Sequence, residues 1–386
     1  GPYAGAEALK ALRRGLNVFL FSDNVPLEEE RAVKALAAKK GLLVMGPDCG
    51  TAILGGVPLG FANAVRRGSI GLVGASGTGL QQVTTRIHAL GGGVSHAIGT
   101  GSRDVYDAVG GTTLLAGLDL LARDAATRVI VIVSKPPQPK VLDAALARAR
   151  SAGKPVVVLF LGASVASAGN IHGVATLDDA AAAAVALANG ETPRRIEPEP
   201  VPGLDAAIAK LASTQKLVRG LFSGGTYCTE AQLVWRDAGL EAWSNAPLEK
   251  SHALAPGVRA AGHSAVDLGV DEYTVGRPHP MIDPAMRIEC IREEARDPAV
   301  AALLLDVVLG YGANADPAGA LAPAIREARA VAARDGRELV VIAFACGTED
   351  DPQPLSQQRA KLAEAGALLA PGSAAAALAA ARVARR

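Results

Sequence analysis

The sequence predicts an α/β protein built from successive doubly wound domains, each with a parallel sheet. Short runs rich in Val, Ile and Leu alternate along the chain with longer segments that read as helices. The runs are continuously apolar and do not alternate with polar residues, as expected for strands covered by helices on both faces. Glycine-rich turns join several of these runs to the segment that follows.

The first part of the chain begins with a helix that has no strand before it, so we expect an upstream βα segment to be missing. The helix predicted at 27–40 has three glutamates in its first turn and two lysines in its last, which suits the helix dipole, and Gly41 is a natural stop. The other helices are predicted at 4–14, 78–90, 113–123, 140–152 and 178–188, and strands at 17–21, 42–45, 70–73, 94–98, 129–133 and 156–161.

A proline-rich stretch divides the chain. Residues 190–203 contain four prolines among Glu and Arg, which predicts a semi-rigid linker. A second βα series follows it, so the two halves are expected to be separate doubly wound units. Its strands are predicted at 217–222, 301–307 and 339–344, and its helices at 226–238, 284–296, 317–332, 354–365 and 373–381.

The composition excludes several classes of protein. The 386 residues carry 39 Lys and Arg against 38 Asp and Glu, so a net charge of +1 gives no bulk attraction for nucleic acid or anionic membranes. Only 3% are aromatic, which disfavours base stacking. No apolar run reaches the roughly 20 residues that a membrane helix needs. Four scattered cysteines without a C-x-x-C pair predict neither zinc site nor disulfide framework, and fit a cytoplasmic protein.

Three glycine-rich turns follow predicted strands: GASGTG at 74–79, FSGGT at 222–226 and LGYGAN at 309–314. Glycines let backbone N–H groups approach a ligand, and a helix start adds positive partial charge, so such turns suit a phosphate or a carboxylate. The alternative for each is a plain βα turn, but two related turns, one in each half, favour anion binding. The predicted phosphate or substrate ligands are Ser76, Gly77, Thr78, Gly224, Gly225, Thr226, Gly310, Tyr311 and Gly312.

The densest polar segment, residues 262–284, supplies the candidate catalytic residues His263, Arg277 and His279. Prolines on either side of His279 hold it and Arg277 rigidly, which suits positioning of a carboxylate or oxyanion. No metal pattern fits the spacing of its histidines and carboxylates, so no metal site is predicted. The alternative is a structural polar loop that anchors the helix starting near Pro284.

Other polar groups follow predicted strands. The charged end of the turn at 99–104, Arg103 and Asp104, is a weak candidate for substrate contact. Cys49 and Cys346 are either nucleophiles or, as we expect, small buried side chains. His172, in a loop of its own, is either catalytic or merely solvated.

The order of these motifs resembles a known superfamily. Residues 43–190, with MGPDCGT, RRGSIGLVGASGTG, IGTGSRD and GKPVVVLFLG, resemble the alpha subunit of succinyl-CoA synthetase and its NDP-forming acyl-CoA ligase relatives. Residues 217–386, with DLGVDEYT and DPAVAALLLDVVLGYG, resemble the carboxy-terminal domain of its beta subunit. The fused arrangement, with FLFSDNVP, FSGGTYCTEAQ, GRPHPMIDP and CGTEDDPQ, resembles the FdrA family.

The resemblance implies a domain plan with flavodoxin-like sheets. Residues 1–64 would be a partial Rossmann-like CoA-binding domain, 65–189 an alpha-like ligase domain, 190–203 the linker and 204–386 a beta-like carboxy-terminal domain. Residues 76–78 and 310–312 match the two helix starts that bind phosphate in the synthetases. Either CoA or a phosphate-type ligand is compatible with this plan.

The departures from the synthetases change the expected chemistry. The loop at 134–138 lacks the glutamate that supports a phosphohistidine, the segment around His172 is only a partial match, and no ATP-grasp segment is present. The FdrA resemblance implies instead a transferase subunit that handles an acyl or carbamoyl phosphate. It would interconvert oxalurate plus phosphate with oxamate plus carbamoyl phosphate in allantoin breakdown, together with partner subunits and as a homo-oligomer. The alternatives are an NDP-forming acid–CoA ligase that uses His172 or His263, and a non-catalytic ligand-binding scaffold.

Overall fold

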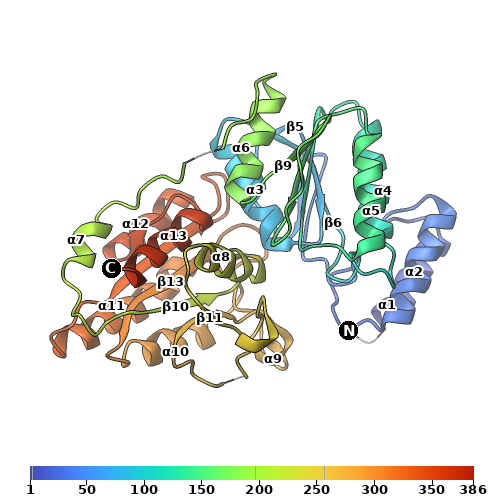
Figure 1. Ribbon diagram of the computed structural model, residues 1–386. Helices are drawn as coiled ribbons and strands as arrows, with labels where there is room; N and C mark the ends of the chain where they lie inside the picture. The colour runs from blue at the N-terminus through green and yellow to red at the C-terminus, as the bar shows by residue number, and fades with distance from the viewer. Residues whose placement is uncertain (2, 196, 256) are drawn as a thin grey trace. The chain divides into compact units, whose positions relative to one another are not determined.

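The computed structural model describes residues 1, 3–195, 197–255 and 257–386. The chain forms two compact units, Gly1–Ile196 and Glu197–Arg386, whose boundary falls inside the predicted linker. Figure 1 shows that each unit has a sheet flanked by helices. The predicted α/β class with parallel sheets is confirmed, and the units are treated separately below.

The N-terminal unit contains a seven-stranded sheet in the order β4-β3-β6-β5-β7-β8-β9. Strands β5 to β9 are parallel, whereas β3 runs antiparallel to both β4 and β6. The chain passes from β5 to β6 on one side and then to β7 on the other, so the strand order reverses between β5 and β7, as in flavodoxin-like sheets. The strands are β3 (Thr51–Leu54), β4 (Val57–Gly60), β5 (Arg67–Gly74), β6 (Val94–Gly99), β7 (Val129–Ser134), β8 (Val156–Phe160) and β9 (Ile171–Gly173).

Helices cover both faces of this sheet. Helices α3 (Gly77–Ala89) and α6 (Leu177–Ala188) pack together on one face, and α4 (Thr112–Arg123) and α5 (Pro139–Arg150) lie on the other (Figure 1). Ile130 and Ile132 of β7 are fully buried in the cluster that α4 and α5 share with the sheet. Burial on both faces explains why the strand sequences are continuously apolar.

The first segment of this unit is small. Helices α1 (Ala4–Arg13) and α2 (Leu27–Lys40) accompany a two-stranded parallel sheet of β1 (Val18–Phe19) and β2 (Val44–Met45). Residues 51–60 lie inside the predicted first domain, yet β3 and β4 pair into the larger sheet. The sequence did not predict these two strands because they are only four residues long and β4 contains Pro58 and Gly60.

A buried ionic cluster joins α2 to the turn after β6. The Nζ atom of Lys34 lies 3.0 Å from Glu30 and 2.7 Å from Asp104, and all three side chains are at most 2% exposed. Asp104 also accepts hydrogen bonds from two backbone N–H groups at the start of α4. Arg103 completes the cluster by bonding Glu30 at 2.8 Å. The prediction that Arg103 and Asp104 contact substrate is therefore wrong, because their charged groups are used inside the fold.

The C-terminal unit contains one parallel sheet in the order β11-β12-β10-β13-β14-β15. Its order reverses between β10 and β13, because the chain fills the β11 side first and the β13 side afterwards. The strands are β10 (Leu217–Phe222), β11 (Ala242–Trp243), β12 (His263–Asp267), β13 (Val300–Val308), β14 (Val340–Cys346) and β15 (Leu368–Leu369). The helices are α7 (Leu204–Ile208), α8 (Gly225–Asp237), η1 (Lys250–His252), α9 (Asp271–Thr274), α10 (Ala285–Glu294), α11 (Pro317–Arg334), α12 (Leu355–Glu364) and α13 (Ser373–Ala384).

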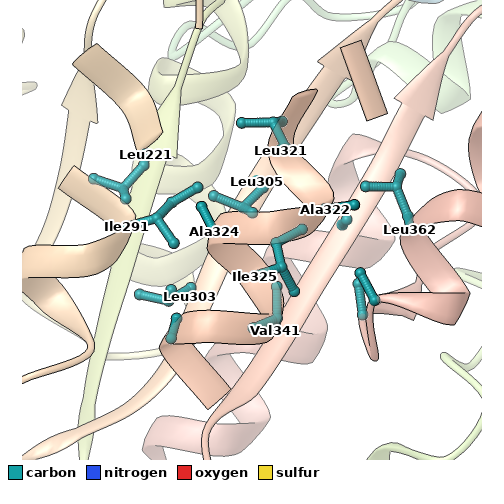
Figure 2. Close-up of a cluster of buried hydrophobic side chains, with 14 of the residues drawn as sticks. Leu221, Ile291, Leu303, Leu305, Leu321, Ala322, Ala324, Ile325, Val341 and Leu362 are labelled. Carbon is teal, nitrogen blue, oxygen red and sulfur yellow. The ribbon is translucent and has the colours of Figure 1, made fainter. Parts of the chain in front are cut away.

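A dense apolar cluster fills one side of this sheet. Figure 2 shows Leu303 and Leu305 of β13 facing Leu321 and Ile325 of α11, with Ile291 of α10 beside them. All five side chains are at most 1% exposed. The alanine-rich α13 packs against α8. The core thus fixes β10 and β13 side by side.

The polar segment 262–284 is not a single loop. Its first residues form β12, which pairs with β10 inside the sheet, and α9 follows. The sequence gives no strand signal here because His263, Ser264 and Asp267 leave only two apolar residues between them. In the described part of the chain, no helix is long and apolar enough to cross a bilayer.

We predict that Lys34→Met lowers the free energy of unfolding of the N-terminal unit by about 3–5 kcal/mol, because it leaves Glu30 and Asp104 buried without a cation. Urea unfolding followed by hydrogen exchange of α2 and α4 amides measures the loss. The control Lys10→Met removes a pair whose side chains are 61% and 66% exposed and should change little. Equal small effects of the two variants would contradict this assignment.

Candidate functional site

Two glycine turns occupy equivalent places in the two sheets. The SGT turn (Ser76-Gly77-Thr78) follows β5, and the SGGT turn (Ser223-Gly224-Gly225-Thr226) follows β10. Each strand is one of the pair between which the strand order of its sheet reverses. Open α/β sheets bind ligands outside the carboxyl ends of strands at this reversal, because neighbouring loops diverge there. Position in the fold therefore supports both turns as candidate sites.

The approach of β5 to the SGT turn requires glycine at position 74. A Cβ atom on Gly74, the last residue of β5, would lie 1.8 Å from the carbonyl oxygen of Val133 in β7. Helix α3 starts at Gly77 with Ser76 as its N-cap, and its first turn contains no acidic residue. The first N–H groups of a helix have no acceptor within the helix. This start is thus suited to an anion, with Thr78 at the second helical position.

The SGGT turn is fixed by a buried carboxylate. Asp306, in β13, accepts hydrogen bonds from the backbone N–H of Ser223 at 2.9 Å and from its Oγ at 2.5 Å. Arg287 of α10 donates to the same carboxylate at 2.8 Å and to the carbonyl oxygen of Leu221 at 3.0 Å. Asp306 is fully buried and Arg287 is 3% exposed. Burial lowers the pKa of the Arg287 guanidinium, although nearby Asp306 opposes this.

A second carboxylate lies at the start of α8. A Cβ atom on Gly225, the first residue of the helix, would be 2.6 Å from Oδ2 of Asp267. The other oxygen, Oδ1, accepts the N–H of Gly269 at 2.9 Å. Burial raises the pKa of Asp267 to about 6; the Gly269 hydrogen bond opposes the rise, and the charges of Asp306 and Glu272 add to it.

His279 lies beside this carboxylate. A Cβ atom on Gly269 would be 2.7 Å from Nε2 of His279 and 3.2 Å from Oδ1 of Asp267. Nδ1 of His279 accepts the N–H of Met281 at 3.2 Å, so the neutral ring carries its proton on Nε2. Burial lowers the pKa of His279, while Asp306 raises it. At neutral pH the ring is therefore an uncharged donor that faces Gly269.

The third glycine turn, residues 309–314, does not lie at a helix start as expected. Helix α11 does not begin at Gly310, Tyr311 or Gly312; it begins at Pro317, where the Asp316 side chain caps it. The N–H of Gly310 donates to Gln353 Oε1 at 2.9 Å. The prediction that residues 310–312 form a helix start is thus wrong, because four residues separate Gly312 from Pro317 and a protein side chain takes the Gly310 donor.

The three predicted catalytic residues do not converge. His263 begins β12 and accepts the N–H of Val218, whereas Asp267 ends the strand; four extended residues separate them by about 13 Å. Burial and the charge of Arg219 lower the pKa of His263. The Arg277 side chain is exposed, and its contact in the described part of the chain is Met286 Sδ at 3.9 Å. Only His279 lies at the SGGT turn.

Sequence analysis assigned no particular role to Asp267, Asp306 or Arg287, which complete the site. One signal was present for Asp306: a single carboxylate inside the apolar run LLLDVV must be paired if it is buried. Its partner Ser223 is 83 positions away, so the pairing follows only from the fold. Burial raises the pKa of the Cys49 thiol to about 12, so it is a small buried side chain and not a nucleophile. No cluster of metal-ligating side chains occurs among the described residues.

Comparisons with known proteins agree with this architecture. The model of the CoA-ligase family matches residues 221–383, and the model of the CoA binding domain matches residues 65–162. The second match begins after residues 1–64, where the sequence led us to expect the CoA-binding part. Uncharacterized protein YahF of Escherichia coli strain K12 is 45% identical over 377 residues, which are 97% of this chain and 73% of YahF. The chain belongs to the YahF family.

Other similar proteins match the YahF-family chain in part. Sulfoacetate-CoA ligase (ADP-forming) subunit SqwL of an Acholeplasma species is 29% identical over 133 residues, which are 33% of this chain and 44% of SqwL. Subunit alpha 2 of an ADP-forming succinate–CoA ligase of Archaeoglobus fulgidus is 26% identical over 141 residues, 35% and 47% of the two chains. Among solved structures, dinucleotide-forming acetyl-coenzyme A synthetase 1 of Ca. Korarchaeum cryptofilum, with phosphate and ADP, is 15% identical, with 100% and 81% coverage and a TM-score of 0.35.

We predict that Asp267→Asn stabilises the YahF-family chain at about pH 7.5 by roughly 2 kcal/mol, and by much less near pH 4. The native pKa of about 6 exceeds the ordinary aspartate pKa of 3.8, so the folded state binds the extra proton and loses stability as pH rises between these two values. Asparagine keeps the acceptor for Gly269 without the charge.

Urea unfolding of the C-terminal unit at the two pH values measures the effect. Asp271→Asn, at an exposed position on α9, is the matched control and should show no such pH dependence. A destabilised Asp267→Asn at the higher pH would show that the charged form is the favoured one.

Proposed function

We propose that this chain binds an activated acid, either an acyl phosphate or carbamoyl phosphate, and takes part in transferring its acyl or carbamoyl group. The matches to CoA-ligase and CoA binding domains support an enzyme of the acid–CoA ligase type as the scaffold. The two glycine turns, each at a helix start and at a reversal of strand order, support phosphate or carboxylate binding. Backbone N–H groups there would stabilise an oxyanion that forms during transfer.

The observation that carries the choice of mechanism is the state of His279. A phosphohistidine relay needs an unprotonated ring nitrogen as nucleophile beside the phosphate site. Nδ1 of His279 accepts a backbone hydrogen bond, so the proton of the neutral ring is on Nε2. Nε2 lies beside Gly269, close to Asp267, and acts as a donor. His279 is thus suited to hold an anion and not to attack it.

The other two histidines considered as carriers also fit poorly. His172 lies within β9, where it pairs with Val157 of β8. His263 begins β12 at the end away from the SGGT turn. Within its own unit, neither residue lies in a loop beside a glycine turn. These placements support transfer without a covalent phosphoenzyme.

The specific reaction we propose is the one that the FdrA resemblance implies. In oxalurate phosphorolysis, the bond between the carbamoyl carbon and the oxamate nitrogen breaks, and a bond from that carbon to a phosphate oxygen forms. A proton passes from phosphate to the leaving nitrogen. Each glycine turn would hold an anionic group, either the phosphate or the substrate carboxylate: the SGT turn through Ser76 and Thr78, and the SGGT turn together with His279. Partner subunits would complete the enzyme.

A second candidate is an NDP-forming acid–CoA ligase. The two family matches and the similarity to an ADP-forming succinate–CoA ligase subunit favour it. It predicts acid-labile phosphoryl labelling of a histidine from ATP and CoA-dependent turnover. The transferase predicts neither. A scaffold without catalysis would bind the ligand and give no product in either assay.

We predict that the chain, assayed with the proteins that copurify with it, forms carbamoyl phosphate from oxalurate and phosphate without ATP or CoA. Thr78→Val and Thr226→Val should lower kcat/KM roughly tenfold each, as expected for a lost hydrogen bond to a charged group. Thr229→Val is the control on the same helix, because its hydroxyl donates to the carbonyl oxygen of Gly225.

Wild-type rates in both Thr78→Val and Thr226→Val would contradict the assignment of the two glycine turns to the substrate site. Phosphoryl transfer from labelled ATP to the chain, lost in His172→Asn or His263→Asn, would establish the ligase in place of the transferase.

A further inference from the structure

The carboxylate of Asp267 lies beside the start of α8, where an anion would bind. Its Oδ2 lies 2.6 Å from the position of a Cβ on Gly225, the first helical residue. Within the described part of the chain, Oδ1 accepts a hydrogen bond from Gly269, and Oδ2 accepts none. The side chain is only 7% exposed. A second anion can share this helix start only if a proton lies between the two acids, because two buried negative charges repel strongly.

The backbone around Asp267 holds the side chain in this place. Asn245 pairs with both main-chain groups of Asp267: Nδ2 donates to its carbonyl oxygen at 2.7 Å, and Oδ1 accepts its N–H at 2.9 Å. Gly269 allows the His279 ring to approach, since a Cβ there would be 2.7 Å from Nε2. The carboxyl group and the ring donor are therefore fixed around the same residue.

We propose that Asp267 is the proton-carrying residue of this site: in its acid form it donates a hydrogen bond from Oδ2 to an anion bound at the start of α8, beside the N–H of His279 Nε2. In its ionised form it repels the same anion. Binding of each anion at neutral pH thus takes up one proton from solvent. The inference rests on the proposed function only for the anion-binding role of the SGGT turn.

The surroundings of Asp267 favour the acid form. Asp306 of β13 and Glu272 of α9 are negative, the Cys228 thiol of α8 is neutral with its pKa raised by burial, and His279 is neutral. The nearest cation in the network, Arg287, is bound to Asp306. The start of α8 favours the ionised form through its positive partial charge, and it attracts the incoming anion equally. A pKa of about 6 makes the proton available at a modest cost near neutral pH.

This arrangement selects a ligand class. A phosphate or carboxylate oxygen can accept the proton that the acid form of Asp267 offers beside the start of α8, whereas a cation or an amide N–H group would meet a donor. The SGT turn differs, because a Cβ atom on Gly77 would have only Thr51 Oγ1 within 4 Å among the described residues, and the first turn of α3 contains no acidic residue. The two turns should therefore bind anions with different pH dependence.

The test is calorimetric titration of the full chain with sulfate, which keeps its charge across the pH range used. At about pH 7.5, buffers of different ionisation enthalpy should report uptake of roughly one proton per sulfate at the SGGT turn. Affinity should fall roughly tenfold for each pH unit above about 6. Asp267→Asn should bind without proton uptake and with little pH dependence.

Two control variants identify the titrating group. Asp271→Asn, on exposed α9, should match the wild type. His279→Gln should bind more weakly and still take up a proton. Thr226→Val assigns the binding event to the SGGT turn by weakening it. None of these measurements needs turnover, so failure of the transferase assay leaves this result standing, and the reverse also holds.

The proposal is overturned if the wild type binds sulfate without proton uptake, if proton uptake persists in Asp267→Asn, or if no sulfate binds at millimolar concentration. In the last case Asp267 is a buried carboxylate that takes no part in ligand binding. Should Asp267→Asn fail to fold, the buffer series on the wild type together with His279→Gln decides the matter. Loss of the uptake in His279→Gln would assign the proton to the histidine and also overturn it.

Discussion

The reversal of strand order in each sheet is the constraint from which the candidate sites follow. Between β5 and β7, and between β10 and β13, successive connections leave in opposite directions, so the loops at the carboxyl ends of β5 and β10 diverge from those of the neighbouring strand. The next helix starts directly at each end, and the N–H groups of its first turn point there. Only glycine fits where β5 meets β7, since a Cβ on Gly74 would strike Val133. The polar chemistry at these edges is built on that backbone.

In the C-terminal unit, the buried carboxylate of Asp306 fixes the glycine turn that follows β10. The N–H and Oγ of Ser223 and the Arg287 guanidinium all donate to this one buried carboxylate. A satisfied buried network of this kind is rigid, because any movement leaves a charge without a partner. It holds the SGGT turn in position before a ligand arrives, which is what electrostatic stabilisation of a transferring group requires. Asp267 and His279 then supply the groups that meet the ligand.

The sequence predicted the regular strand–helix units better than the irregular strand β12 and the buried polar residues of the site. Strand β10 and the start of α8 were predicted to within one residue, because a continuous apolar run followed by glycines is a strong local signal. Strand β12 was missed, since its ends are polar and its burial comes from neighbours that are distant in sequence. The glycine turns were found from local pattern. Sequence analysis selected Arg277 as a candidate and did not consider Arg287. Local sequence could not show that Arg287 is the buried one, because its burial comes from the packing of α10 against the sheet.

We propose that both glycine turns bind the anionic part of the substrate. Amide chemical shifts of the full chain, recorded by NMR during titration with phosphate or carbamoyl phosphate, test this binding. Saturable shifts are expected at Gly77 and Thr78, and at Gly225 and Thr226, with smaller changes at Gly310, whose N–H donates to Gln353. Saturable shifts confined to other regions, with the four turn amides unmoved, would contradict it.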